Sequence, residues 1–314
     1  FRVFVEGKSA LATDRDLLGA RRGLDEDDLD LQNAFFDFWF PITDTEASVT
    51  IRVGRQELLF GKQRLVSPLD WANTRRMFDG VSGIIKFGDW TLTPFYTMPV
   101  PVQKYKFNDI ADDSYFAGLY TTGKVPGVPE IGIDLYWLIL QKDAITFNGA
   151  ANVPTRTAGT AGPMTINTIG GRLFGKIGDT GFDYDVEGAY QVGSIGAGDV
   201  SAFMFATQLG YTLMDVPTSP RFFAGFDYAS GDRGAGGDVN TFNQLFPLGH
   251  AYLGWIDQIG RQNIIAVSLG VTFKPIDKLK VDLVGHMFWR AETTDAAYNA
   301  GGGAFRPAGA GLSN

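Results

Sequence analysis

The chain has 314 residues, with 40 glycines, 25 phenylalanines, 11 tyrosines, 6 tryptophans and no cysteine, and its formal net charge is −8. The lack of cysteine excludes a disulfide scaffold and thiolate metal sites, and the acidic balance argues against a nucleic-acid-binding protein. Glycine disfavours helix interiors whereas aromatic side chains suit strands, so this composition favours an all-β chain.

The most apolar run is IGIDLYWLIL at residues 131–140, and it contains Asp134. It is far shorter than the roughly 18 residues that a membrane-spanning helix needs, which excludes a helical membrane protein. The chain opens on Phe1 already in strand-like alternation, with no visible signal peptide. We therefore expect a trimmed segment of a longer protein.

Alternation of apolar and polar residues predicts thirteen strands of roughly ten residues each. In chain order they are residues 1–8, 31–41, 48–57, 80–87, 90–98, 113–121, 130–141, 165–177, 181–192, 200–213, 220–229, 261–274 and 278–290. In GFDYDVEGAYQVG, at residues 181–193, one face is apolar and the other is acidic. This pattern suits a soluble sandwich with an apolar core, or a membrane barrel with apolar residues toward lipid and charges toward a watery lumen.

Connection lengths favour the barrel. Short connections such as 88–89 and 275–277 alternate with long ones such as 58–79 and 230–260. An up-and-down antiparallel barrel produces this alternation, because tight turns lie at one rim and large loops at the other. Aromatic residues also lie near the short turns, where the interfacial girdle of a barrel is expected. They are Phe40, Phe87, Trp90, Tyr211 and Phe273.

We therefore predict an all-β transmembrane antiparallel up-and-down β-barrel, formed as one domain over residues 1–314 and incomplete at both ends. Thirteen visible strands is an odd number, whereas single-chain bacterial barrels have an even one. We expect about 16–18 strands in the native protein. The glycine- and alanine-rich tail at 299–314 is predicted to be part of an external loop.

Two stretches resemble the alginate-export family of outer-membrane barrels. VGRQELLFGKQRLVSPLDWANTRRMFDGV, at 53–81, has the Gly-Arg-Gln strand end of that family, a loop Gly and Arg, then Asp-Trp, Asn-Thr and Phe-Asp-Gly. FNQLFPLGHAYLGWIDQIGRQNI, at 242–264, is the second match. The resemblance implies a monomeric barrel in the bacterial outer membrane with a charged pore, used in this family to export an anionic polysaccharide.

The connection 58–79 and its flanks are the candidate pore constriction. The residues assigned to it are Arg55, Lys62, Arg64, Asp70, Arg75 and Arg76. Even with Glu57 and Asp79 included, cations outnumber acids, so a loop folded into the lumen would form a narrow, positively biased pore suited to carboxylates. Alternatively, the arginines pair with neighbouring acids and brace the loop. Both interpretations are open for Arg64 and Arg75, and bracing is favoured for Arg76.

The inward faces of the strands supply the candidate lumen wall. Its residues are Arg52, Lys86, Arg172, Asp183, Asp185, Glu187, Arg221, Asp227, Lys280, Asp282, His286 and Arg290. With Asp37, Asp134 and Lys176 added, the wall has seven cations and seven acids. This balance does not indicate a dedicated polyanion tunnel, and opposite charges can instead cross-link the wall, since unpaired charges are costly where a pore narrows.

Three other patterns indicate no chemistry of their own. The acidic run LDEDDLD, at 24–30, lacks the glycine and closing glutamate of a helix-loop-helix calcium site, so we expect a solvated external loop, with an external divalent ion there as the alternative. His250 and His286 lie too far apart in the sequence to indicate a zinc site. Ser268 and His286 lie on adjacent predicted strands, but neither belongs to a nucleophile motif, so we expect no enzyme.

The sequence thus predicts an outer-membrane channel for passive passage of charged solutes, with export of an anionic polysaccharide such as alginate as its candidate task. Its expected partners are membrane lipid and the solute, with no cofactor, no metal, no nucleic acid and a monomeric state. Two alternatives stay open. One is a barrel with a structural or partner-binding role through its long external loops, and the other is a soluble carbohydrate-binding β-sandwich.

Overall fold

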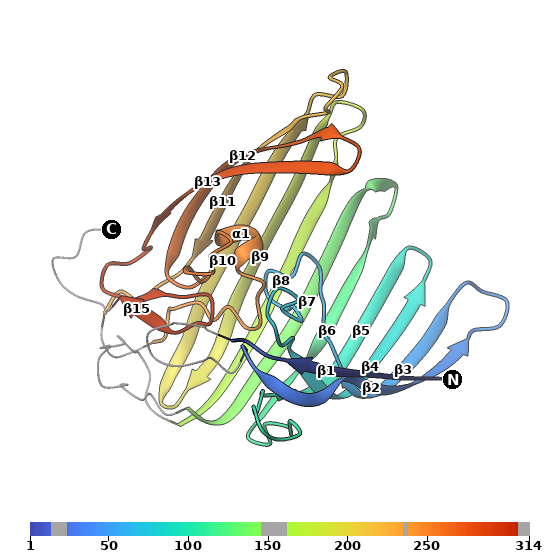
Figure 1. The fold of residues 1–314 in the computed structure, drawn as a ribbon, viewed down its shortest axis with the longest axis vertical. Coiled ribbons are helices and arrows are strands. Elements are labelled where there is room, and N and C mark those ends of the chain that lie inside the picture. Colours follow the sequence, from blue (N-terminus) through green and yellow to red (C-terminus); the bar gives the residue numbers. More distant parts are fainter. Residues whose placement is uncertain (14–23, 146–161, 235–237, 307–314) are drawn as a thin grey trace. The chain divides into compact units, whose positions relative to one another are not determined.

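The structure is a computed structural model, and it describes residues 1–13, 24–145, 162–234 and 238–306. Most of these residues form strands, and there is one short helix (Figure 1). In chain order the elements are β1 (Arg2–Ala10), β2 (Asp27–Pro41), β3 (Ser48–Gln56), β4 (Met77–Phe87), β5 (Trp90–Val100), β6 (Ser114–Val125), β7 (Val128–Ile145), β8 (Gly162–Lys176), β9 (Phe182–Ile195), β10 (Gly198–Thr212), β11 (Arg221–Ala229), α1 (His250–Leu253), β12 (Ile264–Ile276), β13 (Leu279–Trp289), β14 (Ala297–Tyr298) and β15 (Ala304–Arg306).

Strands β1 to β13 form one sheet in which each strand is hydrogen-bonded to the next along the chain. The ladders are antiparallel, as between β8 and β9, where the register runs from Met164 opposite Ile195 to Lys176 opposite Asp183. Strands β1 and β13 stand at the two ends of this order, so the sheet does not close within the described residues. The prediction of an all-β, up-and-down antiparallel fold is confirmed.

All thirteen predicted strands are present, with differences at their ends. The connection between β9 and β10, expected at 193–199, is much shorter, because β9 continues to Ile195 and β10 begins at Gly198. Gly196 has a φ of 57°, which glycine adopts without steric cost, and this allows the tight turn. Helix α1 and the hairpin β14–β15 lie in segments that were predicted to be loops.

The two faces of the sheet are inverted relative to a soluble protein. In β9, Asp185 and Glu187 are buried whereas Phe182 and Tyr190 are exposed. Likewise Phe36 in β2 is 53 % exposed and Leu283 in β13 is 58 % exposed. We call the face with buried polar side chains the inner face and the face with exposed apolar side chains the outer face. A soluble sandwich would bury the second set, so this alternative is not supported.

No helix in the described part of the chain is long and apolar enough to cross a membrane. Phe40 and Phe87 are exposed beside their short turns. Their membership in an interfacial girdle stays a prediction. The connection expected at 142–164 and the tail at 299–314 lie partly outside the described residues.

The chain divides into two compact units. Unit 1 comprises residues 1–121, 137–143 and 245–248, and unit 2 comprises residues 122–136, 144–244 and 249–314. Each unit is described by itself below. The expectation of a single barrel domain over the whole chain stays a prediction.

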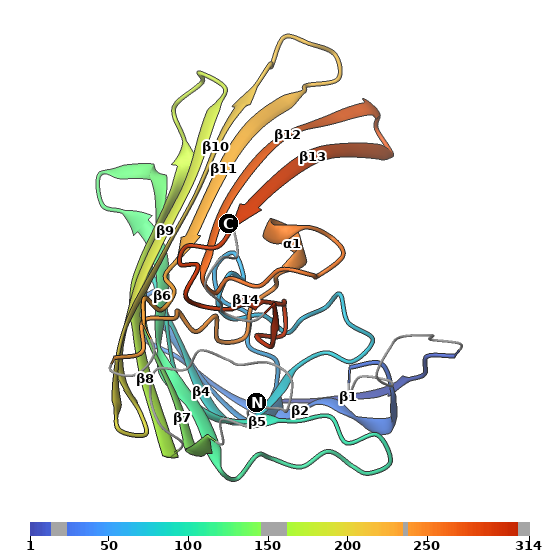
Figure 2. The ribbon, with the colours of Figure 1, turned by 90° about the vertical axis from the view of Figure 1, so that its left-hand side faces the viewer.

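In unit 2, the segment that follows β11 folds back against the inner face of the sheet. Figure 2 shows α1 on the side toward which β10 to β13 curve. Hydrogen bonds agree with this placement, because Gln191 in β9 donates to the carbonyl oxygen of Asn243 at 2.7 Å and Arg261 donates to Asp227 in β11 at 3.0 Å. The long connection between β11 and β12 therefore covers part of the inner face.

Candidate functional site

The connection between β3 and β4, residues 57–76, is called the constriction loop here. Aromatic rings attach it to the inner face of unit 1. The ring of Phe60 stacks on Tyr120 with centroids 4.7 Å apart, while Phe246 meets Phe78 at 5.1 Å and Phe116 at 4.9 Å. Phe78 and Phe116 are almost fully buried. Since burial of aromatic surface is strongly favourable, these contacts hold Phe60 of the loop, and Phe246 from outside the loop, against the strands.

A segment from much later in the chain completes this attachment. The amide of Phe246 donates to the carbonyl oxygen of Leu65 at 2.9 Å, and the amide of Ser67 donates to the carbonyl oxygen of Phe246 at 2.9 Å. Arg76 donates from Nη1 to the carbonyl oxygen of Pro247 at 2.8 Å. The side chain of Arg76 thus braces the loop, which is the role favoured by the sequence.

Arg75 lies between two glutamates from different elements. Its Nη2 is 3.2 Å from Oε1 of Glu6 in β1, and its Nε is 3.1 Å from Oε1 of Glu57. Gln32 donates to the same Oε1 at 2.6 Å. Burial raises the pKa of Glu57 despite the nearby charge of Arg75. Arg75 keeps 35 % of its side chain exposed, so its paired charge remains in contact with solvent.

Arg55 lies at the end of β3, in the Gly-Arg-Gln motif. Gly54 has a φ of 126°, and a Cβ there would lie 2.3 Å from the carbonyl oxygen of Ala34. Only glycine fits so close to the neighbouring strand without strain. Arg55 then stands opposite Asp79 in the β3–β4 register, with Nε 2.8 Å from Oδ1, and its Nη1 reaches Asp30 at 3.1 Å.

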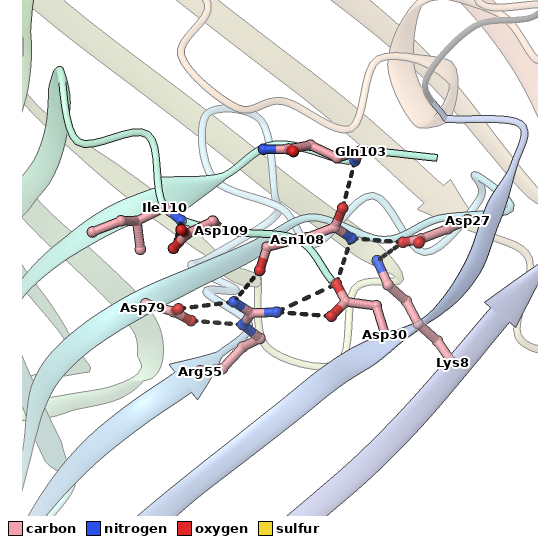
Figure 3. Close-up of polar contacts among 9 residues, drawn as sticks. All are labelled: Lys8, Asp27, Asp30, Arg55, Asp79, Gln103, Asn108, Asp109 and Ile110. Carbon is pink, nitrogen blue, oxygen red and sulfur yellow. Dashed lines mark hydrogen bonds and ion pairs between the residues drawn. The ribbon is translucent and has the colours of Figure 1, made fainter. Parts of the chain in front are cut away.

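Asn108 lies in the segment between β5 and β6 and contacts both Arg55 and Asp30 (Figure 3). Its carbonyl oxygen accepts from Nη2 of Arg55 at 2.8 Å. Its side-chain amide donates to Asp27 at 2.7 Å and also to Asp30. The amide of Gln103 donates to the side-chain oxygen of Asn108, so every polar atom of this side chain is engaged. Asn108 was not predicted, because its partners lie about 80 positions away along the chain.

The acidic run at 24–30 is not a solvated external loop, and this expectation was wrong. Asp25, Glu26, Asp27 and Asp30 are at most 2 % exposed, and β2 begins within the run. Two lysines partly neutralise it, since Nζ of Lys8 is 2.9 Å from Asp27 and Lys104 pairs with Glu26. Burial of these carboxylates is possible only because β1 and the β5–β6 connection bring cations and amides to them.

The remaining predicted constriction residues have different environments. Arg64 is 4 % exposed, whereas Lys62 and Asp70 lie on the exposed surface of the loop. Arg55 and Arg75 meet acids from β1, β2 and β4, so the surplus of cations counted along the loop is largely neutralised in space. The role of these six residues in a constriction stays a prediction.

In unit 1, two wall residues of opposite charge form an ion pair between neighbouring strands. Arg52 in β3 donates from Nε to Asp37 in β2 at 2.8 Å, and its guanidinium lies 3.8 Å from the ring centre of Phe35. Arg2 in β1 donates to the same carboxylate at 3.0 Å. Lys86, near the end of β4, is exposed.

In unit 2, the wall contains a buried arginine with two carboxylate partners. Nη1 of Arg172 in β8 is 2.8 Å from Asp134 in β7, and its Nη2 is 2.6 Å from Asp185 in β9. The side chain of Arg172 is only 5 % exposed. Nearby on the same strands, the hydroxyl of Tyr136 donates to Glu187 at 3.0 Å. This wall segment is cross-linked by charge, and its arginine is neutralised by carboxylates of both neighbouring strands.

The other wall residues of unit 2 also have partners in most cases. Arg221 donates to Asp183 at 2.7 Å, and Lys280 is 3.0 Å from Asp282. Asp227 pairs at 2.9 Å with Arg261, a residue that the sequence did not single out. Arg261 was expected at the start of a strand, whereas the structure places it in the connection before β12. The last two residues assigned to the wall are Arg290, which is buried, and His286, which is half-buried.

Within the described residues, no group of three or more histidine, cysteine, aspartate or glutamate side chains could hold a metal ion. Ser268 stands opposite His286 in the β12–β13 register. His286 stacks on Phe288 with ring centroids 5.7 Å apart.

A search of curated proteins finds no match to the chain. A family model described as alginate export matches residues 1–314, the whole length of the chain. That family consists of outer-membrane transport proteins rather than enzymes. The up-and-down sheet, with its charged inner face and apolar outer face, agrees with that kind of protein. The chain belongs to the alginate export family.

Proposed function

We propose that the protein is a channel in the outer membrane of a Gram-negative bacterium that passes charged solutes without energy input, and that its cargo is an anionic polysaccharide. The observation that carries this proposal is the inverted sheet, with ion pairs on the inner face and exposed apolar side chains on the outer face. Such a sheet can border water on one side and lipid on the other. The proposed channel acts as a monomer and needs no cofactor.

The constriction loop would set the charge preference of this channel. The Arg75 side chain is 35 % exposed, and its partners Glu6 and Glu57 are themselves partly exposed. A carboxylate on a passing solute can therefore exchange with either glutamate as a partner of the guanidinium. Such contacts are weak and repeated, which lets a solute leave as readily as it enters.

Conductance in planar bilayers tests the role of Arg75. We expect Arg75→Gln to lower the ratio of anion to cation permeability by about twofold, because one fixed cation is lost while both glutamates remain. Arg233→Gln is the matched control, since Arg233 is an exposed arginine that pairs with Glu292 at 2.8 Å. A folded Arg75→Gln barrel with unchanged ion selectivity would refute this role.

A second measurement tests the cargo. A polyuronate added to one side should reduce the current through the open channel, whereas a neutral polysaccharide of the same length should have a smaller effect. Equal reduction by both polymers would reject an acidic cargo and leave the channel in place. A folded barrel without conductance would instead favour the structural or partner-binding alternative.

A further inference from the structure

A tryptophan in unit 1 departs from the pattern of buried side chains on the inner face. In β2, Phe36 and Phe38 are exposed on the outer face, whereas Phe35 and Asp37 alternate with them and are buried. Trp39 has the parity of Asp37 and therefore belongs to the inner face, yet it is 58 % exposed. Lipid can cover an exposed ring on the outer face but not on the inner one. Since a single exposed ring is not informative by itself, its surroundings decide what it can bind.

The neighbouring strands place two arginines beside this ring. Asp37, two residues before Trp39, stands opposite Arg2 in β1 and opposite Arg52 in β3. Residues two apart along a strand are about 7 Å from each other, and diagonal neighbours on adjacent strands are within reach of long side chains. One ring-sized ligand can therefore touch the indole and a guanidinium group together.

The two arginines share one carboxylate, which fixes their positions. Oδ1 of Asp37 accepts from Nε of Arg52 at 2.8 Å, and Oδ2 accepts from Nη2 of Arg52 and from Nε of Arg2, each at 3.0 Å. The guanidinium of Arg52 also lies 3.8 Å from the ring centre of Phe35, which is buried. Two positive charges thus meet one negative charge in this group of side chains.

The positive groups of this cluster are the ones that solvent can reach. The Asp37 side chain is 7 % exposed, whereas those of Arg52 and Arg2 are 20 % and 58 % exposed. Both arginines bind Asp37 through Nε and Nη2. Nη1 of neither arginine makes a hydrogen bond to another residue that the structure describes. A ligand carboxylate can therefore accept hydrogen bonds here without displacing Asp37.

We propose that Trp39, Arg2 and Arg52 bind one residue of an acidic polysaccharide on the inner face, near the short turn between β2 and β3. The indole packs on the C–H face of the pyranose ring, and the guanidinium groups bind its carboxylate. The constriction loop begins at the other end of β3, so this site contacts a polymer at a different depth. The choice of an acidic sugar rests on the proposed function.

Titration calorimetry of the purified full chain in detergent, with trigalacturonate as the ligand, tests this site. We expect Trp39→Ala to raise the dissociation constant by about tenfold, because the surface that packs on the sugar is lost. Arg2→Gln should raise it by about threefold and Arg2→Lys by less, since lysine keeps the charge. Asp37 keeps its pair with Arg52 in both variants, so the fold is preserved.

Trp289→Ala is the matched control, because Trp289 is an exposed tryptophan on the outer face of β13 and should not contact the ligand. Unchanged binding in a Trp39→Ala protein with the gel mobility of the folded barrel would overturn the site. Equal binding of neutral trigalactose would overturn the role of the arginines and with it the acidic sugar.

Conductance of the unchanged protein in potassium chloride separates this inference from the proposed function. A conducting barrel that does not bind trigalacturonate refutes the site alone. A folded barrel that binds trigalacturonate through Trp39 without conducting ions refutes the channel and leaves the site.

Discussion

Arg172 in unit 2 and Arg75 in unit 1 each contact two carboxylates, yet their surroundings differ. The side chain of Arg172 is 5 % exposed and that of Asp134 is 1 % exposed. Arg75 is 35 % exposed, and its partner Glu6 is 38 % exposed. The same chemistry therefore produces two kinds of charged group. The buried triad can only brace the wall, whereas the charged groups of the exposed triad remain in contact with solvent.

Position in the chain explains this difference. Arg172 lies in the middle of a regular strand, between neighbours that supply a carboxylate from each side. Arg75 lies in a loop near the start of β4, where side chains meet water on at least one side. Charges on strands are thus expected to affect stability most, and charges on the constriction loop are expected to affect selectivity most.

The largest effect should follow from breaking the buried triad. Arg172→Met leaves Asp134 and Asp185 buried without their cation, so we expect a loss of about 3–5 kcal/mol in the free energy of unfolding. Urea unfolding, followed by the gel mobility of the folded barrel, measures this loss. Arg221→Met is the control, because its pair with Asp183 is more exposed and should contribute about 1 kcal/mol or less.

The triple variant Asp134→Asn, Arg172→Met, Asp185→Asn sharpens the same comparison. It removes all three charges together, so we expect it to be more stable than Arg172→Met alone. Equal stability of these two variants would show that the uncompensated carboxylates are not the cause of the loss.

A smaller effect is expected where the constriction loop is attached. Phe246→Ala removes the ring that contacts Phe78 and Phe116, and we expect it to destabilise the loop by about 2 kcal/mol. The loop should then be cleaved faster by trypsin at the exposed Lys62. Phe107→Ala is the control, since that ring is 60 % exposed. An unchanged cleavage rate in Phe246→Ala would mean that other contacts suffice to hold the loop.

The smallest effect concerns pH and the exposed triad. Burial raises the pKa of Glu57, so on acidification this glutamate takes up its proton at a higher pH than an ordinary glutamate does. Arg75 then loses one neutralising partner, and anion permeability should rise as the pH falls through that raised pKa. Reversal potentials recorded from neutral to mildly acidic pH measure this rise.

Glu57→Gln should lack this pH-dependent rise in anion permeability. A rise that persists in this variant would assign it to another acid.

The raised pKa of Glu57 also determines how this group affects the stability of the fold as the pH changes. The folded state binds the proton of Glu57 more tightly than the unfolded state does. This contribution to stability is therefore complete below the unfolded pKa and is lost as the pH rises through the folded pKa.

The strands and their faces could be predicted because their signal is local. Alternation in β9 alone is enough to place Asp185 and Glu187 on one face and Phe182 and Tyr190 on the other. The motif Gly-Arg-Gln likewise marked the end of β3, where Gly54 permits a close approach to β2.

Partners from distant parts of the chain could not be predicted in this way. Neither the pairing of Arg261 with Asp227 nor the contact of Asn108 with Asp27 leaves a periodic signal in the sequence. The acidic run at 24–30 was misassigned for this reason, because its composition suggests solvation until Lys8 is placed beside it. Composition therefore predicted the charge of the site, but not which charges are neutralised.

Residues 245–248 contact the constriction loop from a point far downstream in the chain. The loop cannot take its final position until the polypeptide beyond β11 is available, and closing so long a chain segment is slow compared with forming a hairpin. If the strands form in chain order, the constriction loop is therefore fixed against its strands only after β11 has been completed.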